Sequence, residues 1–251
     1  MTHTVAVVGG GMAGLGAALA EAQVLLLEQA PAFSEVGAGI QLGPNATRVL
    51  REWGLEASLR ACAAFPDDLC VRAVGDGAEL GRLRLGAHAV QAHGAPYATV
   101  HRADFHQLLQ QAVAATGQVE VRLNQRVDRL SDDARGVALD TATGQRWQAP
   151  AVLGCDGVWS RLREQVWADG PARFTGHLAY RGMVPMADLP ARCGPNRVSA
   201  WLGPRVHAVH YPVRGGAWMN VVVVVHGEHP GEAASWDHQA HATDLRRALG
   251  P

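Results

Sequence analysis

The sequence predicts an α/β fold that opens with a parallel sheet and continues into a β-rich region. Residues 5–27 read as a strand, a glycine-rich turn, a helix and a second strand, which is how a parallel α/β sheet begins. The segment 102–116 carries apolar residues at helical spacing, which predicts an amphipathic helix. From about residue 171, Pro and Gly separate strand-like runs, a pattern typical of antiparallel sheet.

The first part of the chain alternates short strands with helices. Gly54 and Gly117 follow two of the expected helices and are suited to ending them. Residues 37–45 are rich in glycine and are expected to form a loop. The expected strands are 5–8, 24–27, two within 69–85 around a turn at 75–77, 119–123, 126–130, 136–141, 145–149 and 151–154, and the expected helices are 17–22, 46–53, 102–116 and 159–166.

The second part is expected to be mostly antiparallel. Its strands are expected at 177–185, 197–202, 206–213 and 217–226, with a helix at 236–249. The change from alternating strands and helices to strand runs separated by Pro and Gly predicts two domains. They are a nucleotide-binding domain over 1–170, with an excursion near 66–100, and a partial β-rich domain over 171–251.

Composition excludes several classes of function. The chain has 251 residues, 48% apolar and 18% charged, with a formal net charge of −1, so it is globular and has no general attraction to polyanions. Arginines do not cluster with aromatic residues, which argues against nucleic-acid binding. All 22 basic residues are Arg, which excludes Schiff-base lysine chemistry and a Walker A lysine.

Cysteine usage and the apolar runs bear on location. None of the four cysteines has C-x-x-C spacing, and we expect reduced thiols in a cytoplasmic protein. The N-terminus lacks the basic region of a signal peptide. The longest apolar run, at 221–225, is far shorter than the roughly 20 residues that span a bilayer, so no membrane span is expected.

Gly9, Gly11 and Gly14 form a G-x-G-x-x-G motif between a predicted strand and a predicted helix. That context is the one in which the motif binds a dinucleotide. Gly9 permits the tight turn, Gly11 lets the backbone approach a pyrophosphate, and Gly14 allows close helix–strand packing. The helix N-terminus then offers N–H groups to the phosphates. A glycine-rich turn without a ligand is the alternative.

Glu28 ends the second predicted strand. A carboxylate there is expected to accept hydrogen bonds from an adenosine ribose, which favours FAD or NAD over NADP. It lies 14 residues after Gly14, whereas the usual separation in this motif is about 20. The first helix is therefore expected to be about one turn short. A surface glutamate after a strand is the alternative.

At these residues the sequence resembles the class A flavoprotein aromatic hydroxylases, with salicylate hydroxylase and 3-hydroxybenzoate 6-hydroxylase as the nearest types. The resemblance implies a Rossmann-type FAD-binding domain with a β-rich substrate domain. It covers nearly the whole chain. The segments that carry it are residues 7–22, Glu28–Pro31, Glu35–Ala46, His101–Asp104, Gly154–Arg163, Tyr180–Gly182 and His210–Gly216.

The resemblance also implies roles for individual residues. Ala38 and Gly39 would lie near the flavin ring, and Arg102 would reach FAD from the start of its helix. Asp156, in the Asp-Gly motif, would serve both FAD and NAD(P)H. An exposed arginine at a helix start and a turn aspartate are the alternatives for Arg102 and Asp156. Tyr180 and Arg181 would either face the flavin or pack.

Twelve histidines raise the question of a metal site. His207 and His210 are three apart in a predicted strand, a spacing that points them to opposite faces, and no H-E-x-x-H motif occurs; no metal is expected. By the resemblance this strand lines the substrate pocket. We therefore take His210 and Tyr211 as catalytic candidates, with His207 as a further substrate contact and a sheet histidine as the alternative.

The function implied is hydroxylation of a phenolic or hydroxybenzoate-type substrate with FAD, NAD(P)H and O2. A homodimer is left open. The family's later Gly-Asp flavin motif is not found, so we expect a chain truncated at its C-terminus. Two alternatives follow: a catalytically silent FAD- or nucleotide-binding fragment lacking that motif, and a related FAD oxidoreductase that does not use oxygen.

Overall fold

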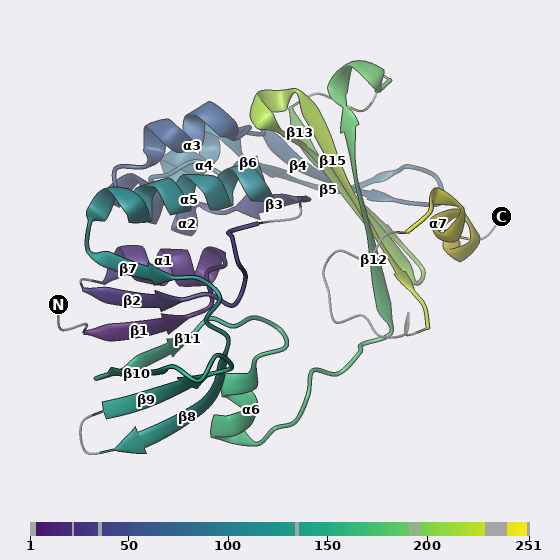
Figure 1. Ribbon diagram of the computed structural model, residues 1–251. Coiled ribbons are helices and arrows are strands. Elements are labelled where there is room, and N and C mark those ends of the chain that lie inside the picture. The colour runs from purple at the N-terminus through teal and green to yellow at the C-terminus, as the bar shows by residue number, and fades with distance from the viewer. Residues whose placement is uncertain are drawn as a thin grey trace. The chain divides into compact units, whose positions relative to one another are not determined.

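The computed structural model describes residues 4–21, 23–34, 37–133, 136–190, 193, 196–228 and 240–249. Its contacts divide the chain into two compact units. Unit 1 comprises Met1–Glu35 and His106–Arg173, and unit 2 comprises Val36–Phe105 and Phe174–Pro251. Figure 1 labels the elements of both units.

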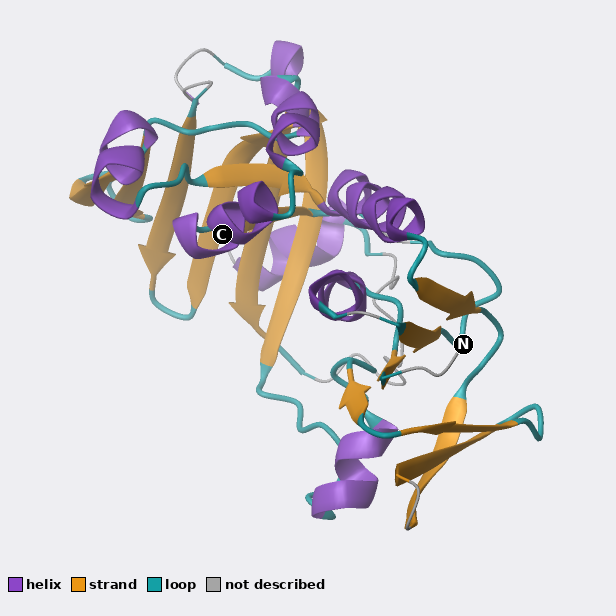
Figure 2. Cartoon of the chain, turned by 90° about the vertical axis from the view of Figure 1, so that its left-hand side faces the viewer, coloured by secondary structure: helices purple, strands orange, loops and turns teal. Residues whose placement is uncertain are grey.

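Unit 1 is built around a four-stranded parallel sheet with the strand order β11-β1-β2-β7. A three-stranded antiparallel sheet, in the order β10-β9-β8, follows β7 along the chain. Helix α6 lies beside this smaller sheet (Figure 2). The elements are β1 (Val5–Val8), α1 (Met12–Ala20), β2 (Val24–Leu27), α5 (Arg102–Thr116, in unit 1 from His106), β7 (Val119–Arg122), β8 (Val127–Asp133), β9 (Gly136–Thr141), β10 (Arg146–Ala149), β11 (Val152–Gly154) and α6 (Arg161–Trp167).

The strands at the centre of unit 1 are buried on both faces. Every residue of β1 and β2 is buried, as expected for parallel strands that read as unbroken apolar runs. The two strands pair from Val5 with Val24 to Val8 with Leu27. This places the glycine loop that follows β1 and the carboxylate that follows β2 at the same edge of the sheet.

Unit 2 is built around a six-stranded sheet with the order β12-β15-β14-β13-β4-β5, in which β13 and β4 run parallel and the other neighbours antiparallel. A two-stranded sheet pairs β3 with β6. The elements are β3 (Gly39–Leu42), α2 (Pro44–Glu52), α3 (Glu56–Cys62), β4 (Asp68–Ala73), β5 (Glu79–Arg84), α4 (Gly86–His93), β6 (Ala98–His101), β12 (His177–Pro185), β13 (Arg197–Gly203), β14 (Val206–Val213), β15 (Trp218–His226) and α7 (Ala242–Leu249).

Several elements differ from the expectations. The segment expected as a loop at 37–45 contains β3, because its backbone pairs with β6. The first helix begins at Met12 rather than 17, directly after Gly11. Helices α3 and α4 and strand β6 were not expected. Of the helix expected at 236–249, the structure has Ala242–Leu249, and residues 236–239 lie outside the described residues.

Candidate FAD and substrate site

Two of the three motif glycines are required by the protein's own packing. Gly9 has a φ of +106°, and a Cβ on it would overlap the carbonyl oxygen of Cys155. A Cβ on Gly14 would overlap the carbonyl oxygen of Gly9. Both clashes are with backbone, which cannot move aside. Gly9 and Gly14 therefore bring β1, α1 and the residue after β11 into close contact.

Gly11 is different, because a Cβ on it would meet nothing within 4 Å. It is the N-cap of α1 and no side chain caps the helix there, so the first N–H groups of α1 have no capping side chain. Protein packing thus gives no reason for a glycine at this position. Open space in front of a helix N-terminus suits a pyrophosphate, so the residues present fit FAD.

Glu28 lies at this loop. Its Oε2 accepts a hydrogen bond from the Gly10 N–H at 2.5 Å, and its Oε1 accepts one from the Ala30 N–H at 2.7 Å. Helix α1 is short, ending at Ala20, and Gln23 before β2 has a φ of +58°. The register of β1 with β2 is nevertheless intact, so the shortened helix does not carry Glu28 away from the glycine loop.

His106, which the sequence did not single out, also contacts the glycine loop. The ring is buried, and its Nε2 lies 2.8 Å from the Gly10 carbonyl oxygen. Because a carbonyl oxygen only accepts, Nε2 is the donor, and Nδ1 accepts from Gln110 Nε2 at 2.6 Å. Phe33 packs edge-on against the ring. No local pattern in the sequence signals this contact, which spans 96 residues.

Asp156 follows β11 and lies near Gly9. Its Oδ1 accepts from the Ser160 hydroxyl at 2.6 Å and its Oδ2 from the Leu162 N–H at 3.2 Å. Ser160 in turn caps α6 by accepting from the Arg163 N–H. The carboxylate therefore organises the start of α6, which is a structural task within the Asp-Gly motif.

In unit 2, the segment Gly37–Gly39, here called the glycine strip, is fixed at each of its residues. The ring of His101 lies against Gly37, where a Cβ would overlap its Nε2. The Ala38 carbonyl accepts from the backbone N–H of Arg102 at 2.9 Å. The Gly39 N–H donates to Asn220 Oδ1 at 2.6 Å.

Asn220 is another residue that the sequence did not single out. It is fully buried, and its Nδ2 has no hydrogen-bond partner among the described residues. A buried donor without a partner costs about 1–3 kcal/mol. A Cβ on Gly39 would lie 2.6 Å from the Tyr211 ring and 2.9 Å from Asn220. Gly39 therefore has to be a glycine, because Tyr211 of β14 and Asn220 of β15 lie against it.

Tyr211 and His210 lie on opposite faces of the six-stranded sheet, since they are adjacent in β14. Tyr211 is buried against Gly39, and desolvation raises the pKa of its phenol to about 12. His210 stacks on Trp201, and burial lowers its pKa. His207, four residues before Tyr211, shares its face by strand alternation. The structure thus separates the two catalytic candidates.

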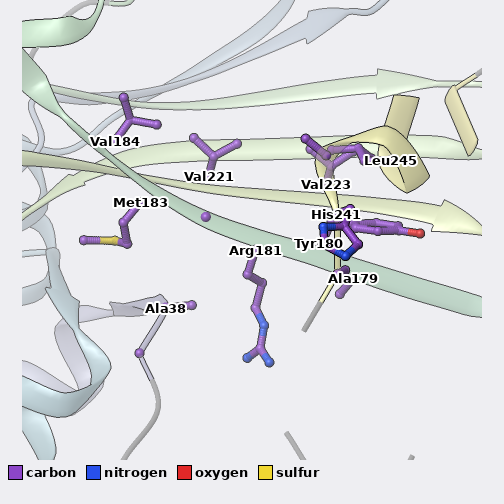
Figure 3. Close-up of a pocket in the computed structure, with 14 residues that line it drawn as sticks. Ala38, Ala179, Tyr180, Arg181, Met183, Val184, Val221, Val223, His241 and Leu245 are labelled. Atoms are coloured by element: carbon purple, nitrogen blue, oxygen red, sulfur yellow. The ribbon is translucent and has the colours of Figure 1, made fainter. Parts of the chain in front are cut away.

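A cavity of about 490 Å³ lies in unit 2 between the glycine strip and strands β12 and β15. Figure 3 shows Arg181 extending from β12 on the side where Ala38 lies. By strand alternation Met183 shares the face of Arg181. Val221 and Val223 pair with Gly182 and Tyr180, so these two valines lie on the opposite face of the sheet. The rest of the lining includes Tyr180, His241 and Leu245. A guanidinium beside an apolar side chain, on the face toward the glycine strip, suits an aromatic acid.

Two further properties bear on the class of site. The described residues contain no group of three or more His, Cys, Asp or Glu placed to hold a metal ion. Among the same residues, no helix combines the length and apolarity needed to cross a membrane.

The chain belongs to the FAD-binding domain family, whose profile matches residues 2–250. The predicted FAD cofactor is confirmed by this match, and the predicted family and fold class are confirmed by it together with the relatives and solved structures below. The chain is 41% identical over 230 residues to a 3-hydroxybenzoate 6-hydroxylase of Polaromonas naphthalenivorans, covering 90% of this chain and 57% of that protein. It is 43% identical over 185 residues to a 6-hydroxynicotinate 3-monooxygenase of Bordetella bronchiseptica, covering 72% and 48%.

Solved structures share the fold. HpxO of Klebsiella pneumoniae, crystallised with FAD and uric acid, superimposes with a TM-score of 0.74 at 21% identity, covering 92% of this chain and 58% of that chain. A salicylate hydroxylase substrate complex gives a TM-score of 0.72 at 24% identity, covering 99% and 63%. The chain thus spans little more than half the length of the curated relatives it matches.

Proposed function

We propose that the protein is an FAD-dependent monooxygenase that hydroxylates a phenolic or hydroxybenzoate-type aromatic substrate with NAD(P)H and O2. The observation that carries the proposal is the cavity of unit 2, because it places the Arg181 guanidinium and the Met183 side chain on one face of β12 beside the glycine strip. The 3-hydroxybenzoate 6-hydroxylases, 36–41% identical to this chain, support the substrate class.

Each unit by itself contains residues that are proposed to contact FAD. In unit 1, the N–H groups at Gly11 and the start of α1 would hold the pyrophosphate, supported by the open space in front of Gly11. Glu28 would accept from the ribose hydroxyls while it keeps the Gly10 N–H in place. In unit 2, Ala38 and Gly39 would border the ring, with Arg102 as a further contact. Asp156 would act through the start of α6.

FAD, when bound, supplies acceptance of a hydride from NAD(P)H and activation of O2. The chain's task is to bind the substrate, orient it and exclude water. Arg181 would pair with the substrate carboxylate, while Met183, on the same face of β12, would pack against the ring. Tyr211 would act as a hydrogen-bond donor from behind the glycine strip, because a phenol is protonated at neutral pH and burial raises its pKa further, to about 12. His210 lies on the opposite face of the sheet against Trp201 and has no part in this arrangement.

The test is product analysis on the purified chain with FAD, NADH or NADPH, and a panel of hydroxybenzoates. The proposal expects flavin absorbance, NAD(P)H oxidation stimulated by a hydroxybenzoate, and one added oxygen in the product. Flavin binding with no stimulated oxidation would instead favour the nucleotide-binding alternative. NAD(P)H oxidation that is stimulated by a hydroxybenzoate but yields only hydrogen peroxide would show that the chain binds the aromatic compound without hydroxylating it.

A further inference from the structure

One cluster of unit 2 has no place yet in the proposed function. It joins two motifs that are 110 residues apart, His101–Asp104 and His210–Gly216. Arg214 forms a bidentate pair with Asp104, with Nε to Oδ2 at 2.8 Å and Nη2 to Oδ1 at 2.9 Å. Both groups converge on His101, whose Nδ1 lies 3.3 Å from Asp104 Oδ1 and 3.3 Å from Arg214 Nη2.

The backbone of Arg214 is unfavourable. Its φ is +54°, in the left-handed region, and Gly215 and Gly216 follow with φ of +63° and +90°. A non-glycine residue in such a conformation carries about 1–3 kcal/mol of strain and persists only where its surroundings hold it. Here the bidentate pair with Asp104 holds it. An arginine kept at a strained position, next to two glycines that would adopt it freely, indicates that the guanidinium has a task there.

The Asp104–Arg214 pair keeps its two charges near neutral pH. Burial alone would raise the pKa of Asp104, but the hydrogen bond and the positive charge of Arg214 outweigh burial and lower it. The pair with Asp104 raises the pKa of Arg214. The cluster therefore presents a fixed carboxylate and a fixed guanidinium to one edge of the His101 ring.

The other edge of the ring lies against the glycine strip. His101 is 8% exposed, and its Nε2 occupies the place that a side chain on Gly37 would take. The backbone of His101 pairs with Gly39 in the β3–β6 ladder, and the next residue, Arg102, donates to the Ala38 carbonyl. The ring is thus wedged between the Asp104–Arg214 pair and Gly37, so that the pair fixes the ring and the ring fixes the strip.

We propose that His101 is a positioning residue for the flavin-facing glycine strip and that Asp104 and Arg214 hold it in that role. This inference rests on the proposed function, because it assigns the strip to FAD. It makes the turn Arg214–Gly216 part of the cofactor site although none of its residues need touch the cofactor. The three side chains act in series, so removing any one of them frees the same segment.

The experiment compares His101→Gln, Arg214→Gln, the double variant and the parent. FAD dissociation constants are measured by flavin fluorescence quenching. We expect each single variant to bind FAD about tenfold more weakly, the scale of one lost hydrogen bond to a charged group. The double variant should bind no more weakly than the weaker single variant, because both act through one ring. Arg214→Lys, which keeps the charge but not the fork, should not restore binding.

A matched control separates this role from general stability. Arg197 and Asp68 form a similar two-bond pair elsewhere in unit 2, between β13 and β4, and Asp68 also accepts from Arg82 Nη1 at 2.9 Å. Asp68→Asn should lower the melting temperature at least as much as Asp104→Asn while leaving FAD affinity unchanged. Equal weakening of FAD binding by both variants, or additive losses in the double variant, would overturn the inference.

A second readout needs no cofactor. Amide hydrogen exchange at Gly39 and Arg102 reports the bonds that these two N–H groups make to Asn220 and Ala38. In the FAD-free chain, exchange at these two amides should be faster in His101→Gln and Arg214→Gln than in the parent and in Asp68→Asn. Unchanged exchange in the two variants would reject the positioning role, whether or not the parent binds FAD. Failure of the parent to bind FAD would count against the proposed function alone.

Discussion

Glu28 Oε2 accepts a hydrogen bond from the Gly10 N–H at 2.5 Å, across 18 residues of sequence. The carboxylate therefore has a structural partner in the loop at which it is proposed to bind ribose. Its second oxygen accepts from the Ala30 N–H.

Replacing Glu28 by Gln tests both roles. Gln keeps one accepting oxygen but loses the charge and the second acceptor, so FAD binding should weaken by about 1–3 kcal/mol. The free energy of unfolding of the FAD-free chain should fall by about 1 kcal/mol, because one backbone N–H loses its partner. Flavin titration and urea unfolding measure the two effects. Unchanged FAD affinity with reduced stability would leave Glu28 only its structural role.

Gly11→Val should abolish measurable FAD binding and leave the fold intact. A Cβ on Gly11 would meet nothing within 4 Å, so the new side chain points into the open space proposed for the pyrophosphate. Circular dichroism, melting temperature and flavin quenching together make the measurement. Gly75→Val, at another open glycine, is the matched control and should bind FAD as the parent does.

Gly14→Ala should unfold or strongly destabilise the chain, since its Cβ would overlap the carbonyl oxygen of Gly9.

The phenol of Tyr211 should resist ionisation. Desolvation raises its pKa from 10.0 to about 12, and a raised pKa of an acid means that the folded state favours the protonated form. The resulting stabilisation is fully present below pH 10 and is lost as the pH rises through about 12. Ultraviolet titration should lose an ionisation step near pH 12 in Tyr211→Phe. A missing step near pH 10 instead would show that the phenol is solvated.

Arg181→Gln should raise the KM for a hydroxybenzoate by about tenfold, the scale of a lost charge-assisted hydrogen bond. The matched comparison is a phenol without a carboxylate, for which the parent and the variant should have similar KM values. Arg181→Lys should recover part of the loss for the acid, because it retains the charge. An equal effect on both substrates would show that Arg181 supports the cavity wall rather than the carboxylate.

Sequence reasoning located the elements whose signal is local. The unbroken apolar runs at 5–8 and 24–27 and the apolar spacing of 102–116 match β1, β2 and α5. The segment 37–45 was expected to be a loop because it contains three glycines. Strand β3 forms there because its backbone pairs with β6. Helices α3 and α4 are short and lack a long periodic pattern, so tertiary packing rather than propensity defines them.

The residues of the site also divide into those with a local sequence signal and those placed by long-range contacts. The spacing of Gly9, Gly11 and Gly14 is a local signal and carries its own physical reasons. The contacts of His106 with Gly10 and of Asn220 with Gly39 cross 96 and 181 residues. Nothing in the neighbouring sequence of either residue announces such a contact. Alternation along β14 already separated His207 from His210; the structure adds that Tyr211 lies against Gly39 and His210 against Trp201.

The parallel pairing of β13 with β4 has a consequence for the chain as it leaves the ribosome. Arg197 and its partner Asp68 are 129 residues apart, so at about 5–20 residues per second β4 waits roughly 6–26 seconds for its neighbour. During that time it has only β5 beside it, and its other edge can pair with any passing strand. Nascent chains shorter than about 200 residues should therefore be the species most in need of a chaperone.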